Sequence, residues 1–169
     1  ASLGVDLLAK SDALVASERE AFEALLASLP EGDPVRGHAV FAGKTGSCTS
    51  CHAMAYVGGR IGPDLSHIGA IRTPRDLLEA IVRPSASFVR SYEPSIVVTD
   101  DGRAFQGVVR EEPGGALAVQ TSATTVERIP REIVESIEPG RTSIMPQGYD
   151  KLLSLQELAD LVAFLHRAK

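Results

Sequence analysis

The sequence predicts a mainly α-helical fold with an inserted small antiparallel β-sheet. Several helix starts are marked by a capping residue that is followed by apolar residues at helical spacing. Between two of these helices, short β-branched runs alternate with glycine turns, as in β-hairpins. A length of 169 residues suits one domain, or a small domain with an insertion.

The N-terminal segment is predicted to be helical in two pieces, over 5–16 and 17–29. Ser17 and Glu20 match a capping box at the start of the second piece. An apolar stripe on this piece consists of Phe22, Leu25, Leu26 and Leu29. We interpret residues 1–33 as an N-terminal helical extension or as the end of a preceding region.

Three further helices are indicated by their start signals. Asp33-Pro34 supplies an N-cap and a proline at the first position of a helix over 34–44. Thr73-Pro74 repeats this signal for a helix over 74–83. The last helix begins at a capping box formed by Ser154 and Glu157. Its apolar residues recur at helical spacing and form one stripe, which consists of Leu155, Leu158, Leu161, Val162 and Leu165.

Residues 92–140 differ from the rest and are predicted to form a β-rich insertion. Turn signals at Asp101-Gly102 and Gly114-Gly115 separate apolar runs that suit hairpin strands. The predicted strands cover 96–98, 105–109, 117–120 and 125–129. A short helix is predicted over 131–137, after the last strand.

The strongest functional signal is the motif Cys48-Thr49-Ser50-Cys51-His52, which contains both cysteines of the chain. Cys-x-x-Cys-His is typical of covalent haem c attachment, in which each thiol forms a thioether with a haem vinyl group. The adjacent His52 then becomes the proximal iron ligand. A structural disulfide, a thioredoxin-like redox pair and a zinc site remain the alternatives, but no second Cys pair or preceding strand favours them.

A second axial ligand is expected on the other face of a c-type haem. Met145 lies in the loop Ser143–Gly148 shortly before the last helix, where a thioether could reach the iron. A buried, gap-filling methionine is the alternative for that residue. His67 is the second candidate ligand, whereas Met54 is too close to His52 to reach the opposite face. His38 and His166 fall on helices and are expected at the surface.

The charge is unevenly distributed along the chain. The formal net charge is −5, yet residues 34–91 hold 7 basic and 3 acidic side chains. Arg60, in the loop between His52 and Pro63, is the predicted partner of a haem propionate. An acidic redox partner could be steered by Arg72, Arg75, Arg83 and Arg90. An acidic chain without an aromatic-rich basic patch is not expected to bind nucleic acid, and no apolar run is long enough for a membrane span.

These residues resemble class I cytochrome c. Gly37 and Phe41 on the first helix of the main domain, with Leu161 and Phe164 on the last, match the positions where the terminal helices of that family cross. The resemblance implies that a backbone carbonyl at Pro63 accepts the Nδ1–H of His52. It also implies that Leu65 packs on the haem face.

A closer resemblance is to the haem-binding domain family of planctomycete and verrucomicrobial multidomain proteins. It rests on Cys48–His52, Gly62–Gly69, Leu77–Ile81, the Asp101-Gly102 hairpin, Ser143–Gly148 and Leu155–Leu165. The resemblance implies a cytochrome c domain over 34–169, with the 92–140 insertion between the haem-attachment half and the half with the distal methionine and last helix. Members of that family are often the last domain of large exported proteins.

We therefore expect a monohaem c-type cytochrome domain that transfers single electrons and is not itself an enzyme. Its partner is expected to be a redox protein or a fused oxidoreductase domain. Because haem c is attached outside the cytoplasm, a periplasmic or otherwise exported location is expected. The alternative is a haem-based gas or redox sensor, or a ligand-binding module, that uses the β insertion.

Overall fold

The structure, a computed structural model, describes residues 2–169, and the side chains of residue 10 and of residues 12–169. The helices of this described part are α1 (Ser2–Ser28), α2 (Pro34–Ala42), α3 (Ile68–Ile71), α4 (Pro74–Val82), α5 (Tyr149–Leu152) and α6 (Leu155–Arg167). The strands are β1 (Ala53–Met54), β2 (Val57–Gly58), β3 (Pro94–Thr99), β4 (Ala104–Glu111), β5 (Leu117–Gln120), β6 (Val126–Ile129) and β7 (Val134–Pro139). Short 3-10 helices cover Cys48–Ser50 and Arg131–Ile133.

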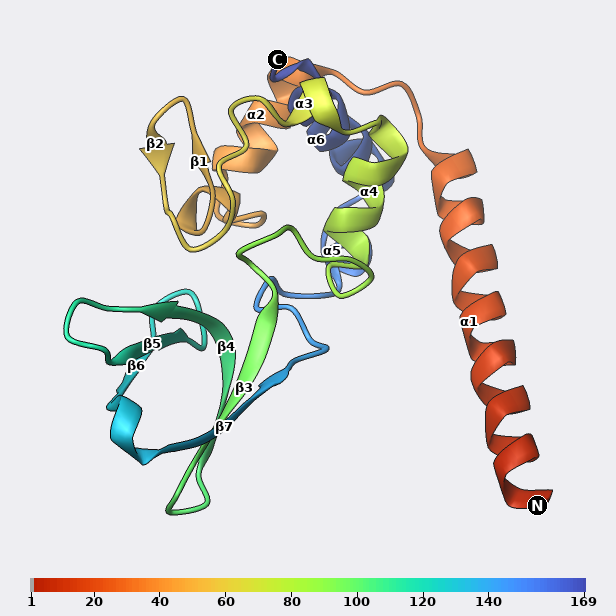
Figure 1. Ribbon diagram of the computed structural model, residues 1–169. Coiled ribbons are helices and arrows are strands. Elements are labelled where there is room, and N and C mark those ends of the chain that lie inside the picture. Colours follow the sequence, from red (N-terminus) through yellow and green to blue (C-terminus); the bar gives the residue numbers. More distant parts are fainter. Residues whose placement is uncertain (1) are drawn as a thin grey trace.

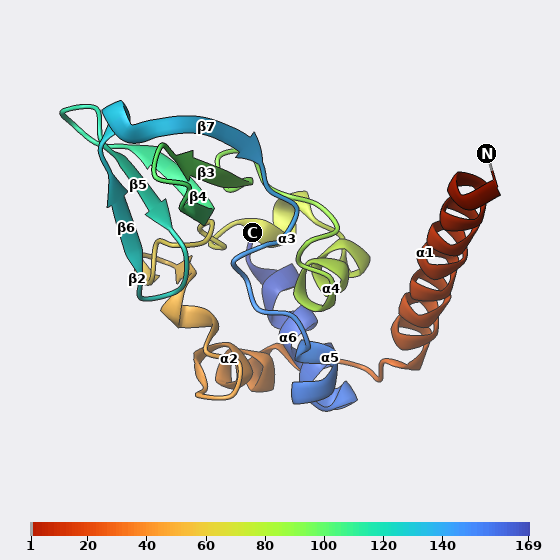
Figure 2. The same cartoon turned by 90° about the horizontal axis from the view of Figure 1, so that it is seen from below.

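The prediction of a mainly α fold of the class I cytochrome c type is wrong. The chain is about 40% helix and 20% strand, and five strands form one antiparallel sheet in the order β6-β5-β4-β3-β7. A helical part and a sheet part therefore lie side by side in a mixed arrangement (Figure 1). Figure 2 shows the same division from below, with α1 extending away from both parts.

The helical part is organised around the crossing of α2 and α6. A Cβ atom at Gly37 would lie 1.9 Å from the backbone oxygen of Asp160, so only glycine permits this approach. Phe41 and Phe164 contact each other beside the crossing, with ring centroids 5.4 Å apart. The crossing predicted from Gly37 and Phe41 is confirmed. The buried residues of this core are Phe22, Phe41, Leu77, Leu78, Ile81, Leu153, Leu158, Leu161, Val162 and Leu165.

Three of the four predicted helix starts are confirmed. The Asp33 carboxylate accepts hydrogen bonds from two backbone amides at the start of α2. Capping boxes begin α4 and α6. Ser17 does not begin a helix, because α1 runs from Ser2 to Ser28 without interruption.

The sheet has one strand more than the four that were predicted. Its first four strands agree with the predicted ones to within about two residues, and each hairpin neighbour pairs in antiparallel register. The helix predicted over 131–137 is wrong, because β7 occupies most of it and pairs with β3. Val97, Leu117, Val119 and Ile129 form a small separate core for the sheet. The structure thus contains a second core that belongs to the insertion alone.

None of the helices in the described part of the chain is both long and apolar enough to cross a membrane. The short hairpin β1–β2 was not predicted. It follows His52 directly, and its turn residues Ala55 and Tyr56 both have positive φ angles, of 49° and 71°.

Candidate functional site

A mostly apolar cavity, the central cavity, lies where the helical part meets the sheet. The volume open to the centres of water molecules is about 240 Å³. A cavity that holds one buried water has roughly 10–15 Å³ of such volume. The predicted site residues on its wall are Cys48, Cys51, His52, Pro63, Leu65 and Met145. Segments nearly 100 residues apart thus meet at one cavity that is large enough for a bulky ligand.

The Cys48–His52 motif is folded into one tight turn. The amides of Cys51 and His52 both donate to the carbonyl oxygen of Cys48, over 3.1 and 2.9 Å. The following loop is tied back to the motif, since the amides of Ile61 and Gly62 donate to the carbonyl oxygen of Cys51 over 3.1 and 2.9 Å. This turn lets both thiols and the imidazole reach the same cavity wall.

The imidazole of His52 is held in one orientation. Its Nδ1 lies 2.8 Å from the carbonyl oxygen of Pro63. Because a carbonyl only accepts, Nδ1 carries the proton and Nε2 keeps its lone pair. Burial lowers the pKa of His52, and the bond to Pro63 opposes this shift only in part. The ring is therefore neutral at pH 7, as an iron ligand must be.

Gly62 is a functional residue that the sequence reasoning missed. A Cβ atom at this position would lie 2.5 Å from Cε1 of His52 and 2.8 Å from its Nδ1. Any other residue would therefore displace the imidazole from its place beside Pro63. The available signal was the Gly62-Pro63 pair itself, whose glycine has no role in a turn.

Both cysteines are free thiols, and burial keeps them protonated. Burial raises the pKa of Cys48 to about 11, and it raises the pKa of Cys51 as well. Tyr149, a second residue that was missed, also lines the cavity, and its hydroxyl donates to the carbonyl oxygen of Gly46 over 3.1 Å. This bond joins the start of α5 to the segment just before the motif.

Met145 is half-buried in the loop between β7 and α5 and lines the central cavity. The predicted insertion contributes Val108 of β4, Ala123 of the loop between β5 and β6, and Tyr92, which precedes β3, to the same wall. The insertion is therefore part of the candidate site, which the sequence did not indicate.

Two predicted candidates are not brought to the central cavity. Arg60 is exposed and lines a smaller pocket of about 60 Å³ with Arg110 of β4. The arginine on the wall of the central cavity is Arg72. His67 is exposed and does not lie on that wall. His38 is exposed as predicted, whereas His166 is partly buried.

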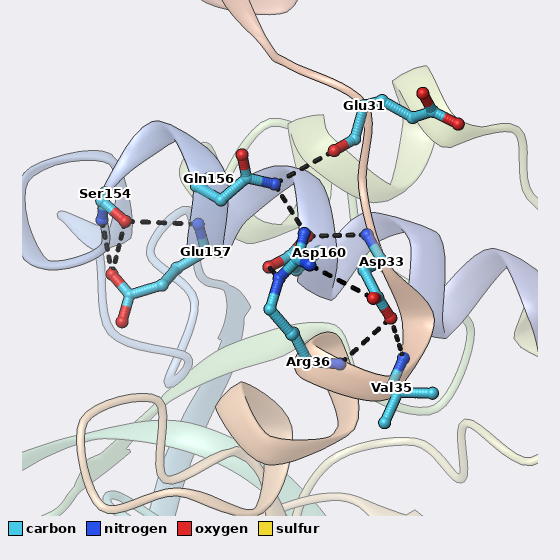
Figure 3. A network of polar contacts seen from close by, with 8 residues as sticks. All are labelled: Glu31, Asp33, Val35, Arg36, Ser154, Gln156, Glu157 and Asp160. Atoms are coloured by element: carbon cyan, nitrogen blue, oxygen red, sulfur yellow. Dashed lines mark hydrogen bonds and ion pairs between the residues drawn. The ribbon is translucent and has the colours of Figure 1, made fainter.

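The helix that leads into the motif is anchored by the buried carboxylate of Asp160 (Figure 3). Asp160 accepts from the guanidinium of Arg36 over 2.7 and 2.8 Å, and from the Asp33 amide over 2.7 Å. Gln156 donates to the same carboxylate over 2.9 Å. The hydrogen bonds from Arg36, helped by those from Asp33 and Gln156, lower the pKa of Asp160 to about 2. This network fixes the start of α2 on α6.

No protein-family model matches this sequence, and no curated protein is significantly similar to it. Among the side chains that the structure describes, those of residue 10 and residues 12–169, no group of three or more His, Cys, Asp and Glu is arranged to hold a metal ion. The residues on the wall of the central cavity nevertheless suit haem c, because two thiols, an oriented imidazole and a thioether surround one apolar space.

Proposed function

We propose that this chain is a monohaem c-type cytochrome domain that carries single electrons. One observation supports the proposal most: Cys48, Cys51, His52 and Met145 all line one mostly apolar cavity. When bound, haem c supplies an iron centre that takes up and releases one electron. The two thiols would attach it, and the side chains of His52 and Met145 would bind its iron.

The protein's own contribution is orientation and exclusion of water. The hydrogen bond to Pro63 fixes the ring plane of His52, and such outer contacts of a ligand also raise its basicity. The apolar walls lower the local dielectric constant around the site, and a methionine ligand raises the reduction potential. The domain would act as an electron carrier for a redox partner or a fused oxidoreductase domain, in the periplasm or another exported location.

Covalent attachment tests the proposal most directly. The chain is produced in the periplasm of a host that attaches haem c, then denatured and extracted with acidic solvent. We expect haem to stay on the protein and the reduced form to show the α and β bands of a c-type cytochrome. The double variant C48S/C51S should lose the covalent haem, whereas S50A, at an exposed position inside the motif, should keep it. A wild-type protein that releases all its haem would overturn the proposal.

The axial methionine has its own test. M145A should lose the weak far-red charge-transfer band that a methionine–Fe(III) bond produces. M54A is the matched control, because Met54 packs against the helical core and does not line the cavity. If wild type lacks the band, or if M145A keeps it, the assignment of Met145 is wrong.

A sensor or ligand-binding module is the second candidate function. It is favoured by the position of Tyr92, Val108 and Ala123 of the insertion on the cavity wall, from which the sheet could respond to a ligand. An electron carrier with both axial positions filled should bind carbon monoxide slowly and weakly in its reduced form at neutral pH. Rapid, tight binding would favour the sensor instead.

A further inference from the structure

The segment that carries Met145 follows the insertion in the sequence, and it is held by the hydroxyl of Ser85, which precedes the insertion. Ser85 follows α4, next to the buried Pro84. Its Oγ accepts the backbone N–H of Ser143 over 3.0 Å and the side-chain amide of Gln147 over 3.2 Å. These two partners stand two residues before and two residues after Met145, so one hydroxyl holds both sides of the methionine segment.

A further hydrogen bond extends this contact to Met145 itself. The Oγ of Ser143 accepts the backbone N–H of Met145 over 3.1 Å. The chain of contacts therefore runs from Ser85 through Ser143 to the backbone of the candidate ligand. All members are half-buried or exposed rather than part of the apolar core, so packing alone does not account for their arrangement.

The sheet makes a different contact with the same segment. Gln106 of β4 donates from its side-chain amide to the carbonyl oxygen of Thr142 over 3.2 Å. Thr142 lies before the part of the segment that Ser85 holds, and this bond restrains only one side of Met145. Of the two contacts, only the one from Ser85 reaches residues on both sides of the methionine.

We propose that Ser85 is a positioning residue that keeps Met145 on the wall of the central cavity and so sets the strength of the methionine–iron bond. The inference rests on the proposed function. Ser85 contacts neither the cofactor position nor Met145 directly, and it acts through the backbone of Ser143 and the side chain of Gln147. Without its hydroxyl, the segment around Met145 would keep the local bond between Ser143 and Met145 and the one-sided restraint from Gln106.

The test uses the haem-loaded protein and measures how easily imidazole displaces the methionine from the ferric form. S85A loses both hydrogen bonds, each of which makes an ordinary net contribution, so it should bind imidazole roughly thirtyfold more tightly than wild type, which is equivalent to about 2 kcal/mol. As the pH is raised, the far-red band of S85A should also disappear at a lower pH than that of wild type. S85T keeps the hydroxyl and should restore most of the wild-type affinity.

Two controls separate positioning from a general loss of stability. S28A removes a serine hydroxyl at the end of α1, where it donates to the backbone carbonyl of Leu25. This variant should leave the imidazole affinity unchanged. Q106A should have a smaller effect than S85A. If S85A does not accumulate, Q147L removes one of the two hydrogen bonds at an exposed side chain and should tighten imidazole binding about fivefold.

The outcomes distinguish the two proposals. A wild-type protein without covalent haem overturns the proposed function. A wild-type protein with covalent haem and the far-red band, but with S85A or Q147L identical to S28A, overturns the role of Ser85 alone. An S85T variant that behaves like S85A would likewise exclude the hydroxyl as the cause.

Discussion

The helical part and the inserted sheet are stabilised in different ways. The helical part depends on contacts between residues far apart in the sequence, such as Gly37 with Asp160 at the crossing of α2 and α6. In the sheet, each strand from β3 to β6 pairs with its neighbour in the chain, and the core is small. The thiols, the imidazole and the thioether of the candidate site belong to the helical part and its loops. The residues that the insertion contributes to the central cavity form only part of its wall. The comparison teaches that the site depends on long-range packing and that the insertion is an accessory to it.

The largest effect is expected at the helix crossing. G37A should destabilise the protein by more than about 4 kcal/mol, because its Cβ would meet a backbone oxygen that cannot move alone. G102A, at a hairpin tip of the sheet, meets no atom within 4 Å and strains only a φ of 81°, which costs about 1–2 kcal/mol. Urea unfolding of both variants gives the comparison. Equal losses would contradict the division between the two parts.

Truncation of one buried side chain in each core should show whether the two parts differ in stability. L158A removes a fully buried side chain of the helical core and should cost about 2–5 kcal/mol. V119A, fully buried in the core of the sheet, should cost about 1–3 kcal/mol. Amide hydrogen exchange should show faster exchange in 94–139 for V119A, with α2 and α6 still protected. Uniform acceleration throughout the chain would mean that the sheet has no separate stability.

A pH-dependent effect is expected at Asp160. The pKa of Asp160 in the folded protein is about 2, below the value near 3.9 of an unfolded chain. Its ionised form therefore stabilises the fold above about pH 4, and this contribution is lost as the pH falls toward 2. D160N should be about 2–3 kcal/mol less stable than wild type at pH 7, since it leaves Arg36 without its buried partner.

The test is urea unfolding of D160N and wild type at several pH values. The difference between them should narrow as the pH is lowered from 4 to 2 and stay constant above pH 5. A difference that is the same at pH 2.5 and pH 7 would show that shape, not charge, is what Asp160 contributes.

The smallest effect is expected on the outside of the sheet. Arg128 of β6 and Glu112 form an ion pair at 3.2 Å, and 66% of the Arg128 side chain is exposed. Exposed pairs contribute at most about 0.5–1 kcal/mol and are screened by salt. R128A should therefore shift the urea midpoint only slightly, and less still in high salt. A loss comparable with that of V119A would show that the sheet depends on its surface charges.

The parts of the structure that were predictable from the sequence depend on local signals. Asp33, Thr73 and Ser154 cap helices through residues two or three positions away, so short patterns suffice. The bond from His52 to Pro63 followed from the resemblance and is confirmed by the structure. The close spacing of Cys48, Cys51 and His52 likewise suffices to bring their side chains to one cavity wall, whereas the haem attachment predicted from this motif stays a prediction.

The missed parts depend on distant partners. Val134 and Ile137 are three residues apart, which suits a helix, but pairing with β3 about 40 residues away makes this segment a strand. Gly62 matters because of the His52 ring it lies against, and Ser85 because of Ser143, 58 residues further along. No local pattern carries such information, and the mainly α prediction failed for the same reason.

The insertion leaves and rejoins the helical part at neighbouring points. The amide of Gly140 donates to the carbonyl oxygen of Pro94 over 2.8 Å, directly beside the pairing of Ser95 with Pro139. For the closure of the chain, the intervening residues are equivalent to a turn whose length hardly matters, since loop-closure entropy rises only with the logarithm of length. A segment of different size exchanged at this neck would keep the two chain ends together, but it would remove the wall residues Val108 and Ala123 and the hydrogen bond from Gln106. The neck is thus a natural point at which to graft a reporter or a binding domain next to the central cavity.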